Sequence, residues 1–349
     1  MNKLIFKLFC SKLIFCIFFV VIAFLLSGCA LNATGRAVQH MPSETNKEPK
    51  IYFCPRDDCG KVLSTHISYA NFSVYCAFYD LELRNVISAL AKKSKTADVR
   101  LVMDKSNYQG QIKGNAIRLD NDKQLMHNKF CVIDRSIVIT GSFNPTDNDN
   151  NYNNNNMEVV HSNALAKNFE DEFGELWEGK FGAGRKSDYH ALSINGIRIE
   201  NYFCPEDCQM ELSSSNDKDS GLYKIADLIK GAEKSVEAAA FTFTSEKVAD
   251  ELIRADERGV KVRVLIENRQ RNVKNSQYLR LKDFGLNIKL DANKGTMHHK
   301  FIIIDDKIVI TGSPNFTNAG FNKNDENMLI IYDANIASKF KDEFYDLWQ

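Results

Sequence analysis

Two copies of one segment dominate the sequence. Met126–Trp177 aligns with Met297–Trp348 without a gap, and 25 of the 52 paired residues are identical. Upstream, the tetrapeptide Tyr52–Pro55 recurs as Tyr202–Pro205. A long repeat of this kind is typical of two structural units that share one fold. The sequence therefore predicts two homologous halves.

Residues 51–180 and 201–349 are the predicted halves, and 181–200 is the predicted linker because it contains glycines and polar residues. In each half, β-rich runs alternate with segments whose apolar residues recur at helical spacing, which predicts an α/β fold. Asp147–Asn156 (DNDNNYNNNN) is low in complexity, and we expect a mobile loop there. The expected strands are 130–133, 137–140, 235–243, 260–266, 301–304 and 308–311, and the expected helices are 165–177, 246–258 and 336–348.

The repeated block carries one polar motif twice. The first copy contains His127, Lys129, Asp134, Ser142 and Asn144, and the second contains His298, Lys300, Asp305, Ser313 and Asn315. A His and a Lys two residues apart on an extended segment point to the same face. That face presents a nitrogen base beside a cation, and Ser and Asn add neutral hydrogen-bond donors. Each copy is half a site, and two facing copies would complete it.

The completed set suits a phosphodiester. One imidazole can attack phosphorus while the other protonates the leaving oxygen. The two lysines can hold the non-bridging oxygens.

The paired HxKxxxxD and GSxN motifs resemble those of the phospholipase D superfamily. The resemblance covers nearly the whole chain after the N-terminal segment. It implies two α/β lobes side by side with pseudo-twofold symmetry and the active site in the cleft between them. It also implies a covalent phosphohistidine intermediate, no cofactor and no metal, and the lysines could supply the charge that a divalent ion supplies elsewhere. Asp134 and Asp305 each lie next to a turn, so we expect them to hold lobe structure.

The two halves differ at one acidic position. Superfamily members usually carry an acid about 28 residues after the motif histidine; the second half has Glu326 there, and the first has Asn155. Glu158, three residues out of register, is the alternative counterpart. The resemblance implies that this acid reaches across the cleft, so that Glu326 would serve His127. We therefore expect His127 to be the nucleophile, and His298, backed by Asn155, to be the general acid.

The N-terminus has the features of an export signal. Three lysines within residues 1–12 precede an apolar run from Leu13 to Leu26, which is shorter than the roughly 20 residues of a membrane span. The following Ser-Gly-Cys29 completes a sequence that resembles the lipobox of bacterial lipoproteins. We expect residues 1–28 to be removed, Cys29 to be lipidated and residues 29–50 to form a flexible tether at the extracytoplasmic side of a membrane. The alternative is an uncleaved anchor helix.

Six cysteines lie outside the signal region. Four of them form two close pairs, Cys54 with Cys59 and Cys204 with Cys208. An oxidising compartment favours a disulfide within each pair, and the alternative is one zinc site built from all four. Cys76 and Cys131 occur in apolar, strand-like runs, where we expect buried thiols.

Overall charge does not identify the substrate. The chain has 45 basic and 45 acidic residues, and loss of the signal leaves 42 and 45, whereas a protein that binds nucleic acid through its global charge is strongly basic. The basic stretch Arg269–Lys282, in which Tyr278 could stack on a base, favours nucleic acid, and a lipid anchor would favour phospholipid. Both substrates stay open, as does an inactive module that only binds phosphate. We expect a monomer because one chain contains both half-sites.

The lipoprotein hypothesis predicts that Cys29 carries the acyl chains. Cys29→Ala should abolish labelling by a fatty-acid probe and release the protein from membranes, because the variant has no thiol to carry the acyl chains that hold the protein on the bilayer. Unchanged labelling of the variant would contradict the hypothesis.

Overall fold

A computed structural model describes residues 41–349 except 113, 115, 121–122 and 210–218, together with the backbone of β1 (Ala30–Leu31) and β2 (Ala37–Val38). The chain divides into two compact units at residue 42, and the second unit, 43–349, is described below. The predicted signal and Cys29 lie outside the described residues. Within the described residues, no helix is long and apolar enough to cross a membrane.

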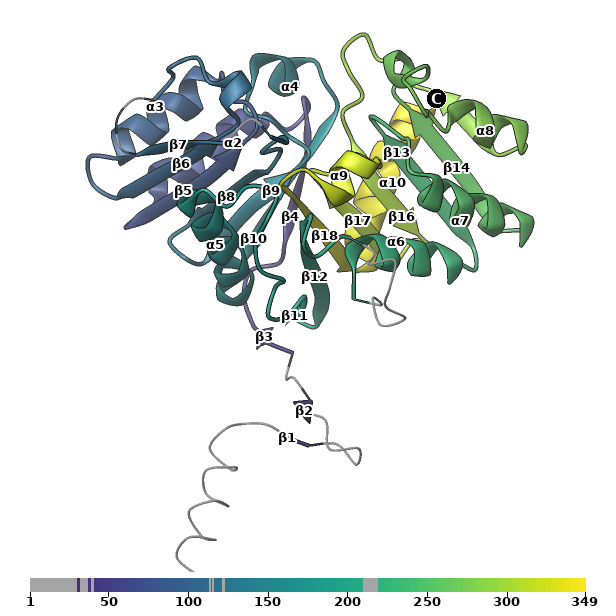
Figure 1. The fold of residues 1–349 in the computed structure, drawn as a ribbon, viewed down its shortest axis with the longest axis horizontal. Helices are drawn as coiled ribbons and strands as arrows, with labels where there is room; N and C mark the ends of the chain where they lie inside the picture. The colour runs from purple at the N-terminus through teal and green to yellow at the C-terminus, as the bar shows by residue number, and fades with distance from the viewer. Residues whose placement is uncertain are drawn as a thin grey trace, which may run out of the picture. The chain divides into compact units, whose positions relative to one another are not determined.

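Two sheets in 43–349 repeat the same strand order (Figure 1). The first is ordered β4 (Lys50–Cys54), β10 (Asn155–His161), β9 (Ile137–Gly141), β8 (Lys129–Ile133), β5 (Ser73–Phe78), β6 (Asp98–Met103) and β7 (Ile117–Leu119). The second contains the matching strands β12 (Ile197–Cys204), β18 (Glu326–Tyr332), β17 (Ile308–Gly312), β16 (Lys300–Ile304), β13 (Ser235–Ala240), β14 (Lys261–Ile266) and β15 (Asn287–Leu290). The predicted α/β fold with a repeated lobe is confirmed.

Helices cover both faces of each sheet. The first half contains α2 (Cys59–Tyr69), α3 (Arg84–Lys93), η1 (Lys105–Asn107), α4 (Asp147–Asn151) and α5 (Asn163–Glu178). The second contains α6 (Gly221–Lys230), α7 (Glu246–Glu257), η2 (Asn268–Gln270), α8 (Tyr278–Asp283), α9 (Asn318–Asn322) and α10 (Ala334–Trp348). Separate cores lie under α2 and α3 and under α6 and α7.

The remaining core joins the two halves. Apolar side chains of α5 and α10, among them Phe169 and Phe340, lie in one buried cluster with residues of both sheets. Ser162 caps α5 by accepting a hydrogen bond from the Leu165 amide at 3.0 Å, and Gly179 ends the helix with φ 88°. The two halves therefore form one folded body.

Three segments and one pair of cysteines differ from the sequence-based expectation. Ser43–Glu44, within the predicted tether, forms β3 and pairs with β11 (Ala191–Ile194), which lies within the predicted linker. The expected mobile loop 147–156 instead contains α4 and the start of β10, because Asp149 binds several neighbouring polar groups. Cys76 and Cys131 form a disulfide between β5 and β8 rather than remaining thiols, since the antiparallel register places them opposite each other.

A buried carboxyl group, that of Glu158, lies at the seam between the halves. Its Oε1 accepts hydrogen bonds from Asn156 Nδ2 at 2.7 Å and from Thr311 Oγ1, in the other half, at 3.3 Å. Among the residues that the structure describes, its Oε2 has no hydrogen-bond partner. Burial, only partly offset by these bonds, raises the pKa of Glu158 to about 7.

Glu158→Gln should therefore stabilise the protein at alkaline pH. Between the ordinary pKa of 4.5 and the folded value of about 7, the unfolded chain releases a proton that the folded chain retains, so the parent loses stability as pH rises. The glutamine variant has no such proton, and its unfolding free energy at pH 8 should exceed that of the parent by about 3 kcal/mol. Denaturant titrations at pH 8 and pH 4.5 should show this gain only at pH 8, and an equal difference at both would contradict the argument.

Candidate functional site

His127 is held by a carboxylate from the other half. His127 Nδ1 lies 2.7 Å from Glu326 Oε2, and Ser313 Oγ donates to the same oxygen at 2.6 Å. The backbones pair at the same place, because the His127 amide donates to the Asp325 carbonyl at 2.9 Å. Glu326 is fully buried. Burial lowers the pKa of His127 although Glu326 opposes the change.

His298 has the equivalent position with different partners. Its Nδ1 lies 2.9 Å from Asn155 Oδ1 and 3.5 Å from Asp149 Oδ2. The His298 amide donates to the Asn154 carbonyl at 2.9 Å, as the pseudo-twofold requires. Asn155 is thus the counterpart of Glu326, and the alternative in which Glu158 takes this place is wrong. Burial and the nearby Lys300 lower the pKa of His298 to about 4.

Asp149 was not anticipated from the sequence. Its Oδ2 accepts hydrogen bonds from the Asn144 backbone amide and side-chain amide, both at 2.9 Å. Burial works against ionisation, but His298 and these hydrogen bonds keep the pKa of Asp149 below its usual range. The matching residue of the second half is Gly320, where a Cβ would overlap the carbonyl oxygen of Asn315. No signal in the repeat indicated this role, because Asp149 is aligned there with a glycine.

The two motif lysines are buried beside the histidines. Lys129 Nζ donates to the His127 carbonyl, and Lys300 Nζ donates to the His298 carbonyl, each at 2.7 Å. Both lysines are 2% exposed. Burial lowers the pKa of Lys129 to about 8, and burial together with Lys129 lowers that of Lys300 further below its usual value. The charges of the two halves therefore act on one another.

The GSxN segments lie at the ends of β9 and β17. A Cβ on Gly141 or Gly312 would overlap a backbone carbonyl of the neighbouring strand, which explains the glycine in both copies. Ser142 Oγ donates to Asn156 Oδ1 at 3.0 Å, whereas Ser313 bonds Glu326 as described above. The side-chain oxygens of Asn144 and Asn315 are buried and have no hydrogen-bond partner within the described residues.

One aromatic ring lies beside each motif histidine. The Tyr79 ring lies 4.7 Å from the His127 ring, and the Phe241 ring lies 4.9 Å from the His298 ring. Lys129 Nζ lies 5.1 Å from the centroid of the Tyr79 ring, and Lys300 Nζ lies 5.1 Å from the centroid of the Phe241 ring. These aromatic residues follow β5 and β13, outside the gap-free part of the repeat, and sequence reasoning missed them.

Asp134 and Asp305 lie in the hairpin turns, away from the histidines. The Asp134 carboxylate accepts hydrogen bonds from the backbone amides of Asn71, Phe72 and Ser73 at 2.7–3.0 Å. Asp305 does the same for the segment before β13. These contacts fit the expected role in holding lobe structure.

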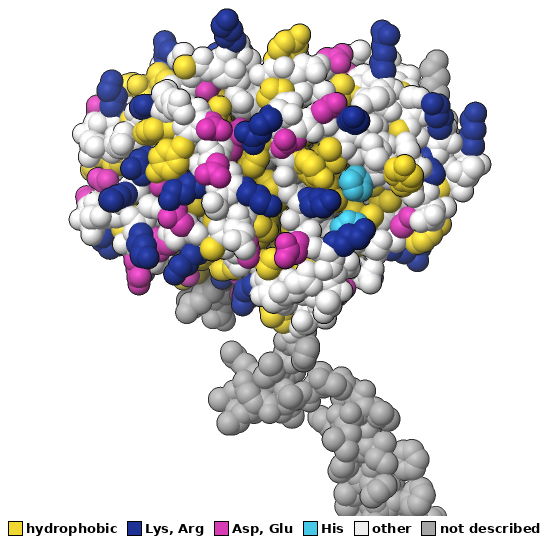
Figure 2. Space-filling model, turned by 180° about the vertical axis from the view of Figure 1, so that it is seen from behind, with side chains coloured by type: hydrophobic (Ala, Val, Ile, Leu, Met, Phe, Trp, Pro, Cys, Tyr) yellow, Lys and Arg dark blue, Asp and Glu magenta, His cyan; other side chains and the backbone are white. Residues whose placement is uncertain are grey.

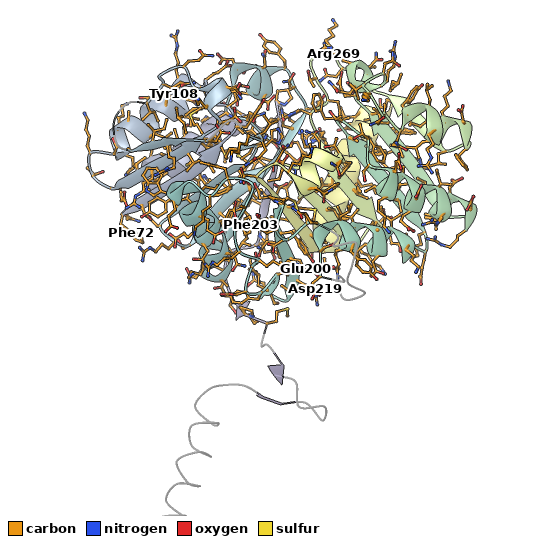
Figure 3. All side chains as sticks on the ribbon, viewed as in Figure 1. Phe72, Tyr108, Glu200, Phe203, Asp219 and Arg269 are labelled. Atoms are coloured by element: carbon orange, nitrogen blue, oxygen red, sulfur yellow. A yellow bond between two sulfur atoms is a disulfide. The ribbon has the colours of Figure 1, made fainter. Side chains whose placement is uncertain are left out.

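A groove of about 350 Å³ lies where the two halves meet, and its lining ends at Thr296, two residues before His298 in the chain. It is lined by Asn148, Tyr152, Asn153, Arg269, Lys294, Gly295 and Thr296. Arg269 lies at the junction of the halves in Figure 3, and Tyr152 is 64% exposed. Two other residues of the predicted basic stretch already have partners in the second half. Arg280 pairs with Asp250, and Tyr278 is partly buried against the core.

The four cysteines of the two close pairs form the expected disulfides, Cys54–Cys59 and Cys204–Cys208. The alternative of one shared zinc site is excluded because these sulfur atoms are bonded to one another. Within the described residues, no group of three or more His, Cys, Asp or Glu side chains could hold a metal ion.

Comparisons with known proteins match both halves. The family model described as "Cardiolipin synthase, PLD-like domain" matches residues 63–177 and 225–348. Mitochondrial cardiolipin hydrolase of Xenopus laevis is 37% identical over 131 residues, 38% of this chain, and the chain spans 62% of that relative's length. Phospholipase D of Rickettsia conorii is 34% identical over 151 residues, covering 43% of this chain and 76% of the relative. The crystal structure of phosphatidylserine synthase of Haemophilus influenzae has a TM-score of 0.65 at 13% identity, covering 84% of this chain and 85% of that one, and it has the same fold.

The geometry predicts that each histidine titrates under the influence of its own carboxylate. Asp149→Asn should lower the pKa of His298 by about one further unit, because a nearby negative charge favours imidazolium. The change can be followed by NMR of the ¹³Cε1-labelled imidazole. Glu326→Gln is the matched control and should lower the pKa of His127 instead. If Asp149→Asn leaves the pKa of His298 unchanged, the 3.5 Å contact does not couple the charge of Asp149 to that imidazole.

Proposed function

Because this chain belongs to the family of PLD-like domains represented by the cardiolipin synthase model, we propose that it is a phosphodiesterase that works through a covalent phosphohistidine. The proposal assigns the nucleophile to His127 and the general acid to His298. The observation that carries it is the 2.7 Å contact between His127 Nδ1 and Glu326, which has no equal at His298.

Glu326 suits His127 for nucleophilic attack. A carboxylate on Nδ1 fixes the tautomer in which Nε2 has the free electron pair. When Nε2 bonds to phosphorus the ring becomes cationic, and the buried carboxylate stabilises that charge. The lowered pKa of His127 keeps the ring neutral before the reaction.

His298 suits proton transfer. Asn155 Oδ1, at 2.9 Å, orients the ring through a neutral hydrogen bond, and the charged Asp149 is farther away at 3.5 Å. The ring can therefore gain and release a proton more readily than one bound directly to a carboxylate. In the second step the same ring takes a proton from the water that cleaves the bond between His127 and phosphorus.

The lysines supply the positive charge for the phosphoryl oxygens. Lys129 and Lys300 are buried beside the two histidines. In a water-poor cleft, fixed cations stabilise a developing charge far better than they do in bulk water. The proposed reaction therefore runs without a metal ion.

The proposed substrate is a phosphodiester of a phospholipid or a nucleic acid. The names of the relatives, cardiolipin hydrolase and phospholipase D, support the lipid. The second candidate, a membrane-tethered endonuclease, is supported by the groove where the two halves meet. Its lining contains Arg269, Lys294 and the exposed Tyr152 but no carboxylate, which suits a backbone phosphate and a stacked base.

The proposed setting is the outer side of a bacterial membrane. The lipobox-like sequence at Cys29 and the three disulfides support it, because disulfides persist in oxidising compartments.

The roles of the histidines can be separated with bis(p-nitrophenyl) phosphate. p-Nitrophenolate leaves without a proton, so His298→Ala should retain the first step and accumulate a phosphoryl group on His127. His127→Ala should lose activity by at least about a thousandfold, since no nucleophile remains. Mass spectrometry at alkaline pH locates the phosphoryl group.

Two controls accompany this measurement. Excess chelator should leave the parent rate unchanged, and a rate that vanishes with EDTA and returns with Mg²⁺ or Zn²⁺ would overturn the metal-free reaction. A phosphoryl group found on His298 would reverse the two roles.

A further inference from the structure

A second pocket, of about 420 Å³, lies on the outside of the first half. Its lining includes Lys47, His66, Tyr69, Phe72, Ser136 and His161. Two large hydrophobic side chains of the lining are exposed, Tyr69 at 80% and Phe72 at 55%. Figure 2 shows two histidine side chains next to each other on this surface, with hydrophobic and basic side chains close by. We call this surface the aromatic–histidine patch.

The patch is separate from the catalytic cleft. Strand β10 begins at Asn155, which contacts His298, and ends at His161 in the patch. Six steps along a strand cover about 20 Å. Phe72 and Arg269 accordingly lie far apart in Figure 3.

The polar groups of the patch suit an anion. His66 Nδ1 donates to the Val62 carbonyl at 2.9 Å, which leaves Nε2 for a ligand. Burial and then the positive charges of Lys47, His66 and Lys50 lower the pKa of His161. A bound anion would reverse that effect and favour the charged rings.

The acid in the lining, Asp134, does not compete for these cations. Its two oxygens accept hydrogen bonds from three backbone amides and from Asn71 Nδ2. Arg135, next to it, pairs with Glu170. The charged and titratable groups of the lining are therefore Lys47, His66, Tyr69, His161 and the one carboxylate of Asp134, and Lys50 acts on His161 from nearby. The groups that are or can become positive outnumber the single anion.

The patch lies next to the point where the chain enters the compact unit. This unit begins at Ser43, four residues before Lys47. The Asn46 amide donates to Asn195 Oδ1 at 2.9 Å, which fixes this segment on the folded body. A chain of 14 residues, from Cys29 to Ser43, spans at most about 50 Å, so a membrane anchor at Cys29 would keep the patch within reach of the bilayer.

We propose that the aromatic–histidine patch docks on the surface of an anionic lipid bilayer. Lys47, His66 and His161 bind headgroup phosphates, while Tyr69 and Phe72 enter the interfacial layer, where amphipathic and aromatic side chains are favoured. Basic side chains near an anionic leaflet add to this attraction. The bilayer is favoured over a nucleic acid because the exposed aromatic side chains lie next to the segment that would lead to a membrane anchor at Cys29. The inference does not depend on the catalytic roles of the histidines.

The test uses the full chain in vesicles, with one added tryptophan. Phe72→Trp reports on the patch, and Phe284→Trp is the matched control because Phe284 is also 55% exposed but lies in the other half. In vesicles containing phosphatidylglycerol and brominated phosphatidylcholine, the tryptophan at 72 should shift to the blue and lose at least half of its emission. The tryptophan at 284 should change little, although the same anchor holds both variants.

A second set of quenching measurements varies the pH, the charge of the lipid and the charge of the patch. Quenching at 72 should increase between about pH 8 and about pH 5, because an anionic bilayer favours the charged form of His161. It should fall severalfold in vesicles of phosphatidylcholine alone, or when Lys47→Gln, His66→Gln and His161→Gln are combined, with hydrolysis of bis(p-nitrophenyl) phosphate unchanged.

Three results would overturn the proposal. Equal quenching at 72 and 284 would mean that the patch has no preference for the bilayer. No quenching at either position would mean that the domain does not dock. An emission shift at 72 with a single-stranded oligonucleotide but not with vesicles would assign the patch to nucleic acid.

Discussion

The contact between Glu326 and His127 depends on how the two halves exchange backbone hydrogen bonds. Leu125 and His127 bond the backbone of Asp325, and Asn154 bonds both Thr296 and His298, so each motif histidine lies next to a strand from the other half. The shared core between α5 and α10 holds these segments in register. A single half has the histidine and the lysine but lacks the group that orients the ring. The active cleft is therefore a property of the fused pair, and the repeat is the feature on which the chemistry depends.

The pseudo-twofold axis also shows where the halves have diverged. Position 155 is an asparagine where the second half has Glu326, and Asp149 is an acid where the second half has Gly320. Because Gly320 cannot accept a side chain without overlapping Asn315, the second half cannot copy Asp149. Both histidines thus lie near a negative charge, but one contact is direct at 2.7 Å and the other is longer at 3.5 Å. Two imidazoles with different partners can divide the work of a nucleophile and an acid.

Much of this architecture could be predicted from the repeat, because identical residues at a constant offset imply identical surroundings. The pairing of Asn155 with His298 followed from that offset, whereas Glu158 required a shift of register that β10 does not allow. Asp149 could not be predicted, because an acid within an asparagine-rich run gives no periodic signal and its role depends on the folding of α4. The Cys76–Cys131 bond also depends on register, since nothing in either strand indicates which residues lie opposite each other. Tyr79 and Phe241 escaped notice because they lie outside the gap-free alignment.

The charges of the cleft indicate how binding and protonation are linked. Without substrate, Glu326 and Asp149 are held ionised, while burial disfavours the charged forms of both lysines and of His298. A phosphodiester anion placed among them adds a negative charge and raises the pKa values of all three cationic groups. In the proposed reaction it is useful that the cationic groups gain their charge only when the substrate binds. His127 needs a free electron pair and stays next to its fixed carboxylate, whereas His298 needs a proton that the empty cleft does not favour. Binding of the anion supplies the missing stabilisation, so the general acid becomes charged when there is a leaving group to protonate.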